Sequence, residues 1–212
     1  MASIPLKPQY GPTLGRLLEP SWRAVRPAAR AAAIVAGGVL SVFLIVAVLS
    51  LLDASYSHGG PVPFSFRYRG LYRTAPDPGG YVKVARGSHG QLEDSFAVAP
   101  LRMQPYSGSV TGAVPLRAAA YIRALQRRFA GFRLQSEGKT RITSTLAGYD
   151  IRYSALVEGH RLSGRDIFLL PSGGPVREGV VLEMLTSEHT SVAKPVATQG
   201  VLEKPLKTFS LG

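Results

Sequence analysis

The longest apolar segment of the chain is an uncharged run from Ala31 to Leu52, bounded by Arg30 and Asp53. As an α-helix, a run of this length rises about 33 Å, and the hydrocarbon core of a bilayer is about 30 Å thick. A cleaved signal peptide usually has a shorter apolar core with a small-residue cleavage site after it, and a buried core helix usually keeps a polar stripe. The pattern therefore predicts an uncleaved transmembrane helix over residues 31–52.

Small residues recur every four positions at the start of this run, at Ala29, Ala33, Gly37 and Ser41. Small side chains at this spacing let two helix backbones approach closely in a membrane, which predicts a parallel homodimer through the transmembrane helix. Alanine and glycine are also abundant in the rest of the chain, so composition alone explains the spacing, and we favour this simpler interpretation. Both interpretations stay open.

Beyond this run, hydrophobic and polar residues alternate in short segments, and a period of two is typical of a half-buried β-strand. The clearest case is FSFRYRGLY, in which Phe64, Phe66 and Tyr68 alternate with polar residues. Turn-forming sequences, such as APDPGG at residues 75–80, separate these segments. The predicted strands cover residues 64–72, 81–85, 95–103, 148–157, 161–170 and 180–187, and shorter extended pieces flank an expected Glu137-Gly138 turn within residues 132–145.

One segment has the helical period instead. From Leu116 to Phe129 the apolar residues form one stripe, and Pro115 suits the first turn of a helix. A weaker helical pattern follows around residues 192–205. Strands, one helix, further strands and a C-terminal helical piece predict an α+β domain with a largely antiparallel sheet and flanking helices.

The predicted organisation has four parts. They are a disordered basic head at residues 1–30, the transmembrane helix at 31–52, a linker rich in glycine, proline and serine at 53–63, and the α+β domain at 64–212. The chain contains no cysteine, so its stability must come from a hydrophobic core rather than from disulfides.

The distribution of charge predicts an orientation and a class of partner. Lysine and arginine number 25 against 13 aspartate and glutamate residues, a formal net charge of +12. In the head, five basic residues face only Glu19, so the positive-inside rule places the N-terminus in the cytoplasm and the domain outside the cell membrane. A basic domain there is attracted to the lipid bilayer or to an anionic cell-wall polymer. Nucleic acid is not expected, because the compartment is wrong and the charge is spread out.

Candidate catalytic motifs are incomplete. The segment Ser191–Lys194 matches the S-x-x-K pattern of acyl enzymes, but the S-D-N and K-T-G elements that accompany it are missing from the sequence. Gly138-Lys139-Thr140 resembles the end of a phosphate loop, yet the preceding glycine, Gly131, is too far away. The four histidines are spread along the chain near turns. We therefore expect no catalytic residue, no cofactor and no metal site.

Three arginines on the expected helix, Arg123, Arg127 and Arg128, predict a basic face for an anionic polymer or a partner protein. An ordinary solvated helix face has the same pattern. Glu93 and Asp94 are adjacent on an expected strand, so they point to opposite faces and are interpreted as two solvated carboxylates.

Several segments together resemble the Mog1/PsbP-like group. They are the F-x-F-x-Y strand, the amphipathic helix, F-x-L-x-x-E-G-K-T-x-I, G-Y-x-I-x-Y and the terminal K-T-F-S-L, which together span Phe64 to Leu211. The resemblance implies an α/β/α sandwich that serves as a non-catalytic binding or assembly module, often tethered to a membrane. The group shares no universal catalytic residues, so the resemblance assigns no active site.

These observations favour a single-pass, membrane-anchored module of the bacterial cell envelope that binds another envelope protein or a cell-wall component. The alternative is an enzyme that acts on envelope material through an unrecognised site. An enzyme should bring polar, ionisable side chains together in one pocket of the folded domain, whereas a binding module should offer a groove without a nucleophile–base pair.

Overall fold

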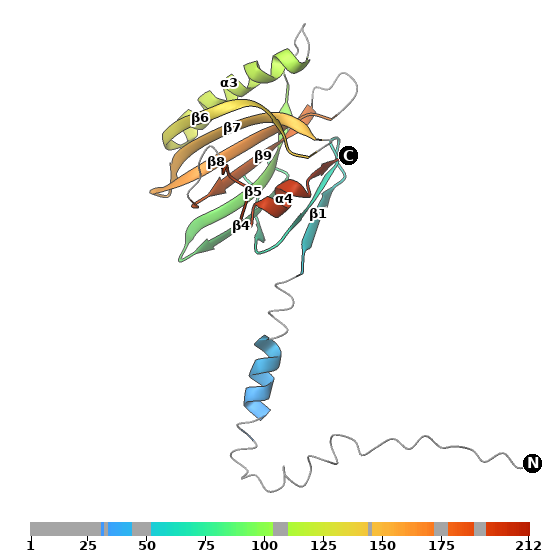
Figure 1. The fold of residues 1–212 in the computed structure, drawn as a ribbon, viewed down its shortest axis with the longest axis vertical. Coiled ribbons are helices and arrows are strands. Elements are labelled where there is room, and N and C mark those ends of the chain that lie inside the picture. The colour runs from blue at the N-terminus through green and yellow to red at the C-terminus, as the bar shows by residue number, and fades with distance from the viewer. Residues whose placement is uncertain are drawn as a thin grey trace, which may run out of the picture. The chain divides into compact units, whose positions relative to one another are not determined.

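Figure 1 shows the computed structural model of the chain, which describes residues 31, 34–43, 52–103, 110–143, 146–171, 178–188 and 194–212. The chain divides into two compact units, Met1–Leu51 and Leu52–Gly212. The predicted head, the residues Ser191–Ala193 of the S-x-x-K motif and His189 lie outside the described residues.

In the first unit, residues 34–43 are helical, and the hydroxyl of Ser41 donates a hydrogen bond to the carbonyl of Gly37 within the same helix, at 2.8 Å. A helix of this length rises about 15 Å, roughly half of the hydrocarbon thickness. No helix among the described residues is long and apolar enough to cross a membrane. The transmembrane helix in the predicted fold class is therefore wrong for the part of the chain that the structure describes, and the homodimer through it stays a prediction.

The second unit is built around a seven-stranded antiparallel sheet with the strand order β3-β4-β5-β9-β8-β7-β6. Its strands are β3 (Tyr72–Thr74), β4 (Val82–Ser88), β5 (Gln91–Arg102), β6 (Ala130–Arg141), β7 (Ala147–Val157), β8 (His160–Leu169) and β9 (Glu178–Thr186). Consecutive strands pair from β3 to β5 and from β6 to β9, and β9 joins the two groups by pairing with β5.

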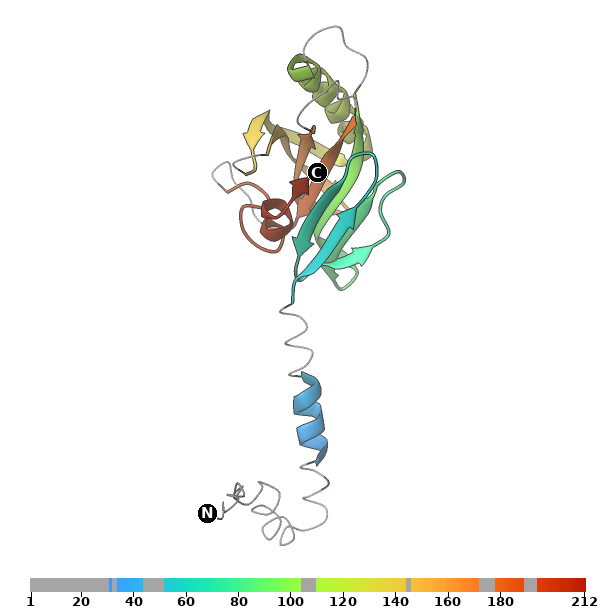
Figure 2. The same cartoon turned by 90° about the vertical axis from the view of Figure 1, so that its right-hand side faces the viewer.

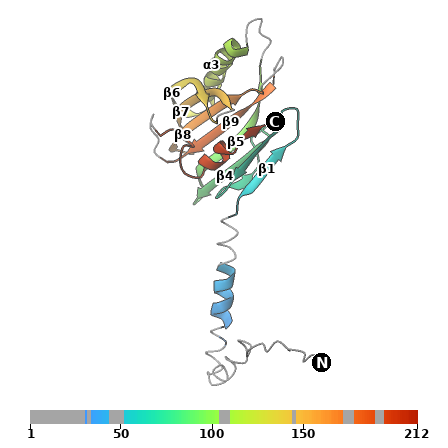
Figure 3. The ribbon, with the colours of Figure 1, turned by 45° about the vertical axis from the view of Figure 1, so that its right-hand side comes forward.

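A smaller antiparallel sheet, β1-β2-β10, forms a second layer. Its strands are β1 (Ala54–His58), β2 (Phe64–Tyr68) and β10 (Ser210–Leu211), and the short helix α4 (Glu203–Lys207) packs beside β2. The long helix α3 (Val110–Arg128) contacts β6 and β7. Figures 2 and 3 show these elements from two further directions.

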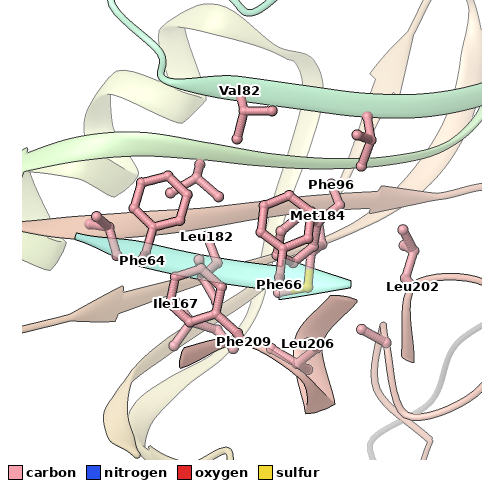
Figure 4. Close-up of a cluster of buried hydrophobic side chains, with 14 of the residues drawn as sticks. Phe64, Phe66, Val82, Phe96, Ile167, Leu182, Met184, Leu202, Leu206 and Phe209 are labelled. Atoms are coloured by element: carbon pink, nitrogen blue, oxygen red, sulfur yellow. The ribbon is translucent and has the colours of Figure 1, made fainter. Parts of the chain in front are cut away.

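The seven-stranded sheet is covered on both faces. On one face, a cluster of buried apolar side chains joins it to β2 and α4, with Phe64 and Phe66 pointing toward Phe96, Leu182 and Met184 (Figure 4). On the other face, a second cluster joins it to α3 through residues that include Ala118, Ile122, Leu125, Tyr153 and Phe168. Alternation along each strand therefore supplies two cores, because successive side chains point to opposite faces.

The predicted fold class is corrected by this architecture. The sheet is antiparallel, but the second unit has only two helices in its described residues, and a three-stranded sheet with α4 covers the face where a sandwich of the α/β/α type places helices. The physical reason is that β1 and β10 complete a sheet with β2, which buries Phe64 and Phe66 without a helix.

Local boundaries also differ from the predictions. Residues 54–58, within the predicted linker, form β1, and β6 runs through the expected Glu137-Gly138 turn as a bulged strand. Helix α3 begins at Val110, so Pro115 lies inside the helix instead of in its first turn. In the weakly helical stretch around 192–205, only the residues from Glu203 begin a helix among those described.

Replacing Phe66 with alanine tests whether the two sheets form one cooperative unit. Phe66 is 2 % exposed, and its ring centre lies 4.9 Å from that of Phe96 on the larger sheet. We expect Phe66→Ala to lower the free energy of unfolding by about 3–5 kcal/mol in denaturant titrations, because a cavity replaces the ring. The exposed Leu116 serves as the control, and Leu116→Ala should change it by less than about 0.5 kcal/mol. Equal losses in both variants would contradict a core at this position.

Candidate functional site

A row of paired residues crosses the face of the sheet that α3 covers. Lys83 on β4 pairs with Ala97 on β5, Ala97 with Glu183 on β9, and Glu183 with Asp166 on β8. Directly opposed residues of antiparallel strands point to the same face, so the two carboxyl groups lie side by side under α3. Asp166 is fully buried there, and Glu183 is half-buried.

Tyr121 of α3 reaches down between the two carboxyl groups. Its hydroxyl oxygen lies 3.1 Å from Oδ2 of Asp166 and 2.8 Å from Oε1 of Glu183. A phenol has one proton to donate, so one of the two contacts needs a protonated carboxyl group that donates to the phenol oxygen. Its ring packs edge-on against Phe168 at 5.1 Å between centres, which fixes the side chain on the sheet.

Tyr153 of β7 completes the polar group from the other side. Its hydroxyl lies 3.4 Å from Oδ1 of Asp166. Its ring lies over Gly164 of β8, where an added Cβ atom would come within 2.3 Å of the ring. The glycine is required because only a residue without a side chain lets this ring lie flat across the neighbouring strand.

Burial sets the protonation of this group. Complete burial, followed by the nearby charge of Glu183, raises the pKa of Asp166 well above its ordinary value, and the hydrogen bonds of both tyrosines only partly oppose this rise. Burial also raises the pKa of Tyr121 and of Tyr153, with the two carboxyl groups acting in the same direction. The neutral Asp166 is therefore the group that donates to Tyr121.

The resulting arrangement is a one-directional chain of hydrogen bonds. Tyr153 donates to Asp166, protonated Asp166 donates to Tyr121, and Tyr121 donates to the carboxylate of Glu183. Among the described residues, the side chain of Glu183 has no other hydrogen bond, and neither carboxyl group forms an ion pair. The negative charge of the group is thus concentrated at Glu183, without a cation in contact.

A cavity of about 220 Å³ lies over this group, between the sheet and the second half of α3. It is lined by Asp77, Lys83, Leu92, Ser95, Ala97, Tyr121, Leu125, Arg128, Phe129, Tyr153, Val157, Glu158, Asp166, Glu183 and Leu185. Apolar side chains form much of the wall, and the polar groups are the carboxyl pair, the two phenols, one serine and the charged residues of the rim.

The rim of the cavity is held by one carboxylate shared between two cations. Nζ of Lys83 lies 3.0 Å from Oδ1 of Asp77, and Nη2 of Arg128 lies 2.5 Å from Oδ2 of the same residue. Partial burial raises the pKa of Asp77, but the hydrogen bonds from Lys83 and Arg128 outweigh it and lower the pKa overall. These contacts tie the end of α3 to the loop before β4.

The three arginines predicted to form a basic face on the helix point in two different directions. Arg123 and Arg127 are exposed and lie one turn apart on α3. Arg128 is 48 % exposed and turns instead to Asp77 at the cavity rim, where the charge of Glu183 also acts on it. The structure therefore does not bring the three arginines together as one face, and the binding of an anionic partner there stays a prediction.

The other residues that the sequence analysis singled out lie in strands, turns or the core and form no further site among the described residues. Asp94, expected to be solvated, is 2 % exposed, accepts hydrogen bonds from Arg86 and Thr186 at 2.6 Å each, and so holds β4, β5 and β9 together. Gly138-Lys139-Thr140 lies in β6 and forms no phosphate loop. Among the histidines, His89 and His160 are exposed, and His58 packs against Phe64 and Tyr81. No group of three or more metal-ligating side chains occurs in the described ranges.

Sequence reasoning missed the carboxyl pair. Asp166 stands in a predicted strand as the single charged residue of DIFLL, and Glu183 is likewise alone in VVLEMLT. An isolated acid inside an otherwise apolar strand is a usable signal, because a charge is seldom buried without a reason. Their pairing depends on the register between β8 and β9, which the sequence does not reveal.

The pH dependence of stability tests the protonation of Asp166. A raised folded-state pKa stabilises the fold below the unfolded value of about 3.9, and this contribution is lost as the pH rises through the folded-state value. Asp166→Asn keeps one donor and one acceptor without the titration. Relative to this variant, the wild type should lose up to about 1.4 kcal/mol of unfolding free energy per pH unit within that window.

Asp150 on β7 provides the matched control. It is 4 % exposed and pairs with Arg165 through two contacts, at 3.0 and 3.1 Å, on the opposite face of the sheet. Asp150→Asn breaks an ion pair and should cost about 3–5 kcal/mol near neutral pH, where Asp166→Asn should be neutral or stabilising. The protonation is refuted if Asp166→Asn destabilises the chain as much as Asp150→Asn near pH 7.

Comparisons with known proteins assign no family to this chain. Neither the family models nor the curated proteins contain a match, so the Mog1/PsbP-like resemblance has no support from them. Among solved structures, LpqN of Mycobacterium tuberculosis, described as involved in cell envelope biogenesis, superposes with a TM-score of 0.49 at 6 % identity, covering 75 % of this chain and 91 % of its own. A Pseudomonas aeruginosa protein of unknown function, described as a putative regulator, reaches 0.33 at 9 % identity, covering 63 % and 82 %. Likeness this low assigns neither a fold family nor a function.

Proposed function

We propose that the chain is a non-catalytic binding module of the cell envelope, and that the cavity under α3 takes a small cationic group. The observation that carries this proposal is the hydrogen-bond chain from Tyr153 through Asp166 and Tyr121 to Glu183. It fixes a carboxylate in the cavity wall and leaves it without a cation in contact among the described residues.

The balance of charge around the cavity supports a cationic occupant. With Asp166 neutral, three carboxylates line it against two cations, a net charge of −1. Asp77 shares its one negative charge between Lys83 and Arg128, so one positive charge stays at the rim and the two remaining negative charges lie at Glu183 and Glu158. An ammonium group can donate hydrogen bonds to this side, and charge-assisted hydrogen bonds are about twice as strong as neutral ones.

The size of the cavity limits what can enter. Pockets for drug-sized ligands hold roughly 300–1,000 Å³, and this cavity holds about 220 Å³. The walls contributed by Leu125, Leu185 and the phenol rings suit a short alkyl chain. The proposed occupant is therefore an alkylammonium group, either free or as the end of a larger molecule.

The same lining favours binding over catalysis. Among the described residues that line the cavity there is no histidine, and Ser95 is the one hydroxyl nucleophile besides the phenols. Asp166 is fully buried, so it does not reach a substrate directly. Polar groups do converge in one pocket, which keeps an enzyme as the alternative, but no nucleophile–base pair supports it.

An envelope location is proposed from the sequence. The uncharged run at 31–52 and the basic residues before it suit attachment to a lipid bilayer. The orientation with the folded unit outside the cell membrane rests on the same charges and is tested by protease accessibility in intact cells.

Binding of n-butylammonium to the purified chain tests the cavity. We expect it to raise the melting temperature and to perturb the NMR signals of Tyr121 and Tyr153, whereas n-butyrate and n-butanol should do neither. Glu183→Gln keeps the acceptor for Tyr121 and removes the charge, so affinity should fall about 10- to 100-fold. Glu178→Gln, at the exposed start of the same strand, should leave the affinity unchanged. Equal binding of n-butanol, or an unchanged affinity in Glu183→Gln, would reject the proposal.

Extraction of bacterial membranes with alkaline carbonate tests the attachment. The wild-type chain should stay in the membrane pellet, because carbonate releases proteins held by charge alone. Leu40→Asp combined with Phe43→Asp should shift it to the soluble fraction, since a buried charge in a bilayer costs about 2.5–3.5 kcal/mol. Release of the wild type by carbonate would contradict attachment through residues 31–52.

A further inference from the structure

The surface around residue 53, where the second unit begins, is basic. Four cations lie at this position, and we call them the basic base. They are Arg67 on β2, Arg69 just after it, and Lys204 and Lys207 on α4. Arg67, Arg69 and Lys207 are exposed, and Lys204 keeps 36 % of its side chain exposed.

Contacts between distant parts of the chain gather these cations. Lys204 of α4 pairs with Asp53, which lies 151 positions earlier. The backbone N–H of Arg67 donates to Oγ1 of Thr208 at 2.9 Å, and that hydroxyl donates back to the carbonyl of Arg67 at 3.1 Å or to that of Lys204 at 2.8 Å. The end of α4 is therefore fixed against β2, and Lys204 shares one surface with Arg67 and Arg69 around Asp53.

The acidic residues on this surface do not neutralise it. Asp53 is engaged by Lys204, and Glu203 lies 2.5 Å from Nζ of Lys207 within α4. The hydrogen bond from Lys204 lowers the pKa of Asp53 despite the opposing effect of burial, and the charges of Arg69 and Arg67 add to the lowering. Two acids thus stand against four cations, which leaves an excess of two positive charges.

Exposed apolar side chains accompany the cations. Leu52 is 62 % exposed and Tyr72 is 75 % exposed. Tyr72 follows Tyr68 by four residues, so it lies within about 14 Å of the point where Tyr68 pairs with Ala54. Tyrosine beside arginine and lysine is the combination found at membrane–water interfaces, where the ring lies at headgroup level.

Basic side chains of this kind are attracted to lipid. Each lysine or arginine near an anionic membrane surface adds to the attraction, and the effect falls off within a Debye length. Asp53 follows the last residue of the uncharged run directly in the sequence. The proposal that follows rests on the membrane attachment proposed above.

We propose that the basic base is a binding surface for the headgroups of anionic phospholipids, which seats the folded unit directly on the bilayer. The arginines and lysines bind the phosphate groups, and Tyr72 and Leu52 enter the interface. This surface is separate from the cavity under α3, so lipid contact does not compete with an occupant of the cavity.

A single thiol probe in the full-length chain tests this proposal, because the natural sequence has no cysteine. Ser55 is exposed on β1 and pairs with Arg67, so Ser55→Cys carries an environment-sensitive fluorophore at the proposed contact. The labelled chain is reconstituted in vesicles of phosphatidylcholine alone or with phosphatidylglycerol. Flotation reports attachment, and quenching by neutral acrylamide reports contact of the probe with lipid.

We expect flotation with both vesicles, but protection of the probe only where phosphatidylglycerol is present, and its loss at high salt. Arg67→Gln with Arg69→Gln should lower the docking constant about 25-fold, since each cation near an anionic surface contributes about five-fold. Arg123→Gln with Arg127→Gln, an equal change of charge on α3, should have no effect.

The outcomes separate the two proposals. A chain that floats with both vesicles but is quenched equally in both would overturn the basic base and leave the attachment intact. Equal protection in the Arg67/Arg69 and Arg123/Arg127 variants would also overturn it, because net charge would then be the cause. A chain that floats only with phosphatidylglycerol would support the basic base and contradict attachment through residues 31–52.

Discussion

The pairing of β8 with β9 is the constraint on which the rest of the fold depends. Ile167 opposes Leu182 on one face of this pair, and Asp166 opposes Glu183 on the other. A shift by one residue would exchange the two faces, placing carboxyl groups in the core beneath β2 and apolar side chains under Tyr121. The register of this one ladder thus decides both where the larger core forms and where the acidic group lies.

The sequence predicts elements better than their arrangement. Alternation along SFAVAPLR and GYDIRYSALV places β5 and β7, because a half-buried strand shows a period of two. It does not predict that β9 inserts between β5 and β8, since pairing across the sheet joins residues such as Pro100 and Val180 that lie far apart in the chain. The role of β1 was hidden for a related reason. ASYSH is followed by glycines and prolines typical of a linker, and only pairing with β2 makes it a strand.

The carboxyl groups inside the fold are of two kinds, which differ in the side chains that contact them. Asp150 and Asp94 are buried with arginines in contact, so their burial is explained by the fold. Asp166 and Glu183 are held by phenols alone among the described residues, and that difference marks them as a candidate site. Composition and motif searches treat all four alike. Only the three-dimensional partners distinguish a carboxylate with an arginine in contact from one without.

The contact between Asp53 and Lys204 has a mechanical consequence. A pull on the chain at Leu52 acts first on β1, which is paired with β2, and through Asp53 and Lys204 on α4. The load is therefore taken up by the smaller sheet and the helix beside it. The central strands that carry the acidic group lie behind the larger core, so a pull at Leu52 reaches the cavity only after the smaller sheet has given way.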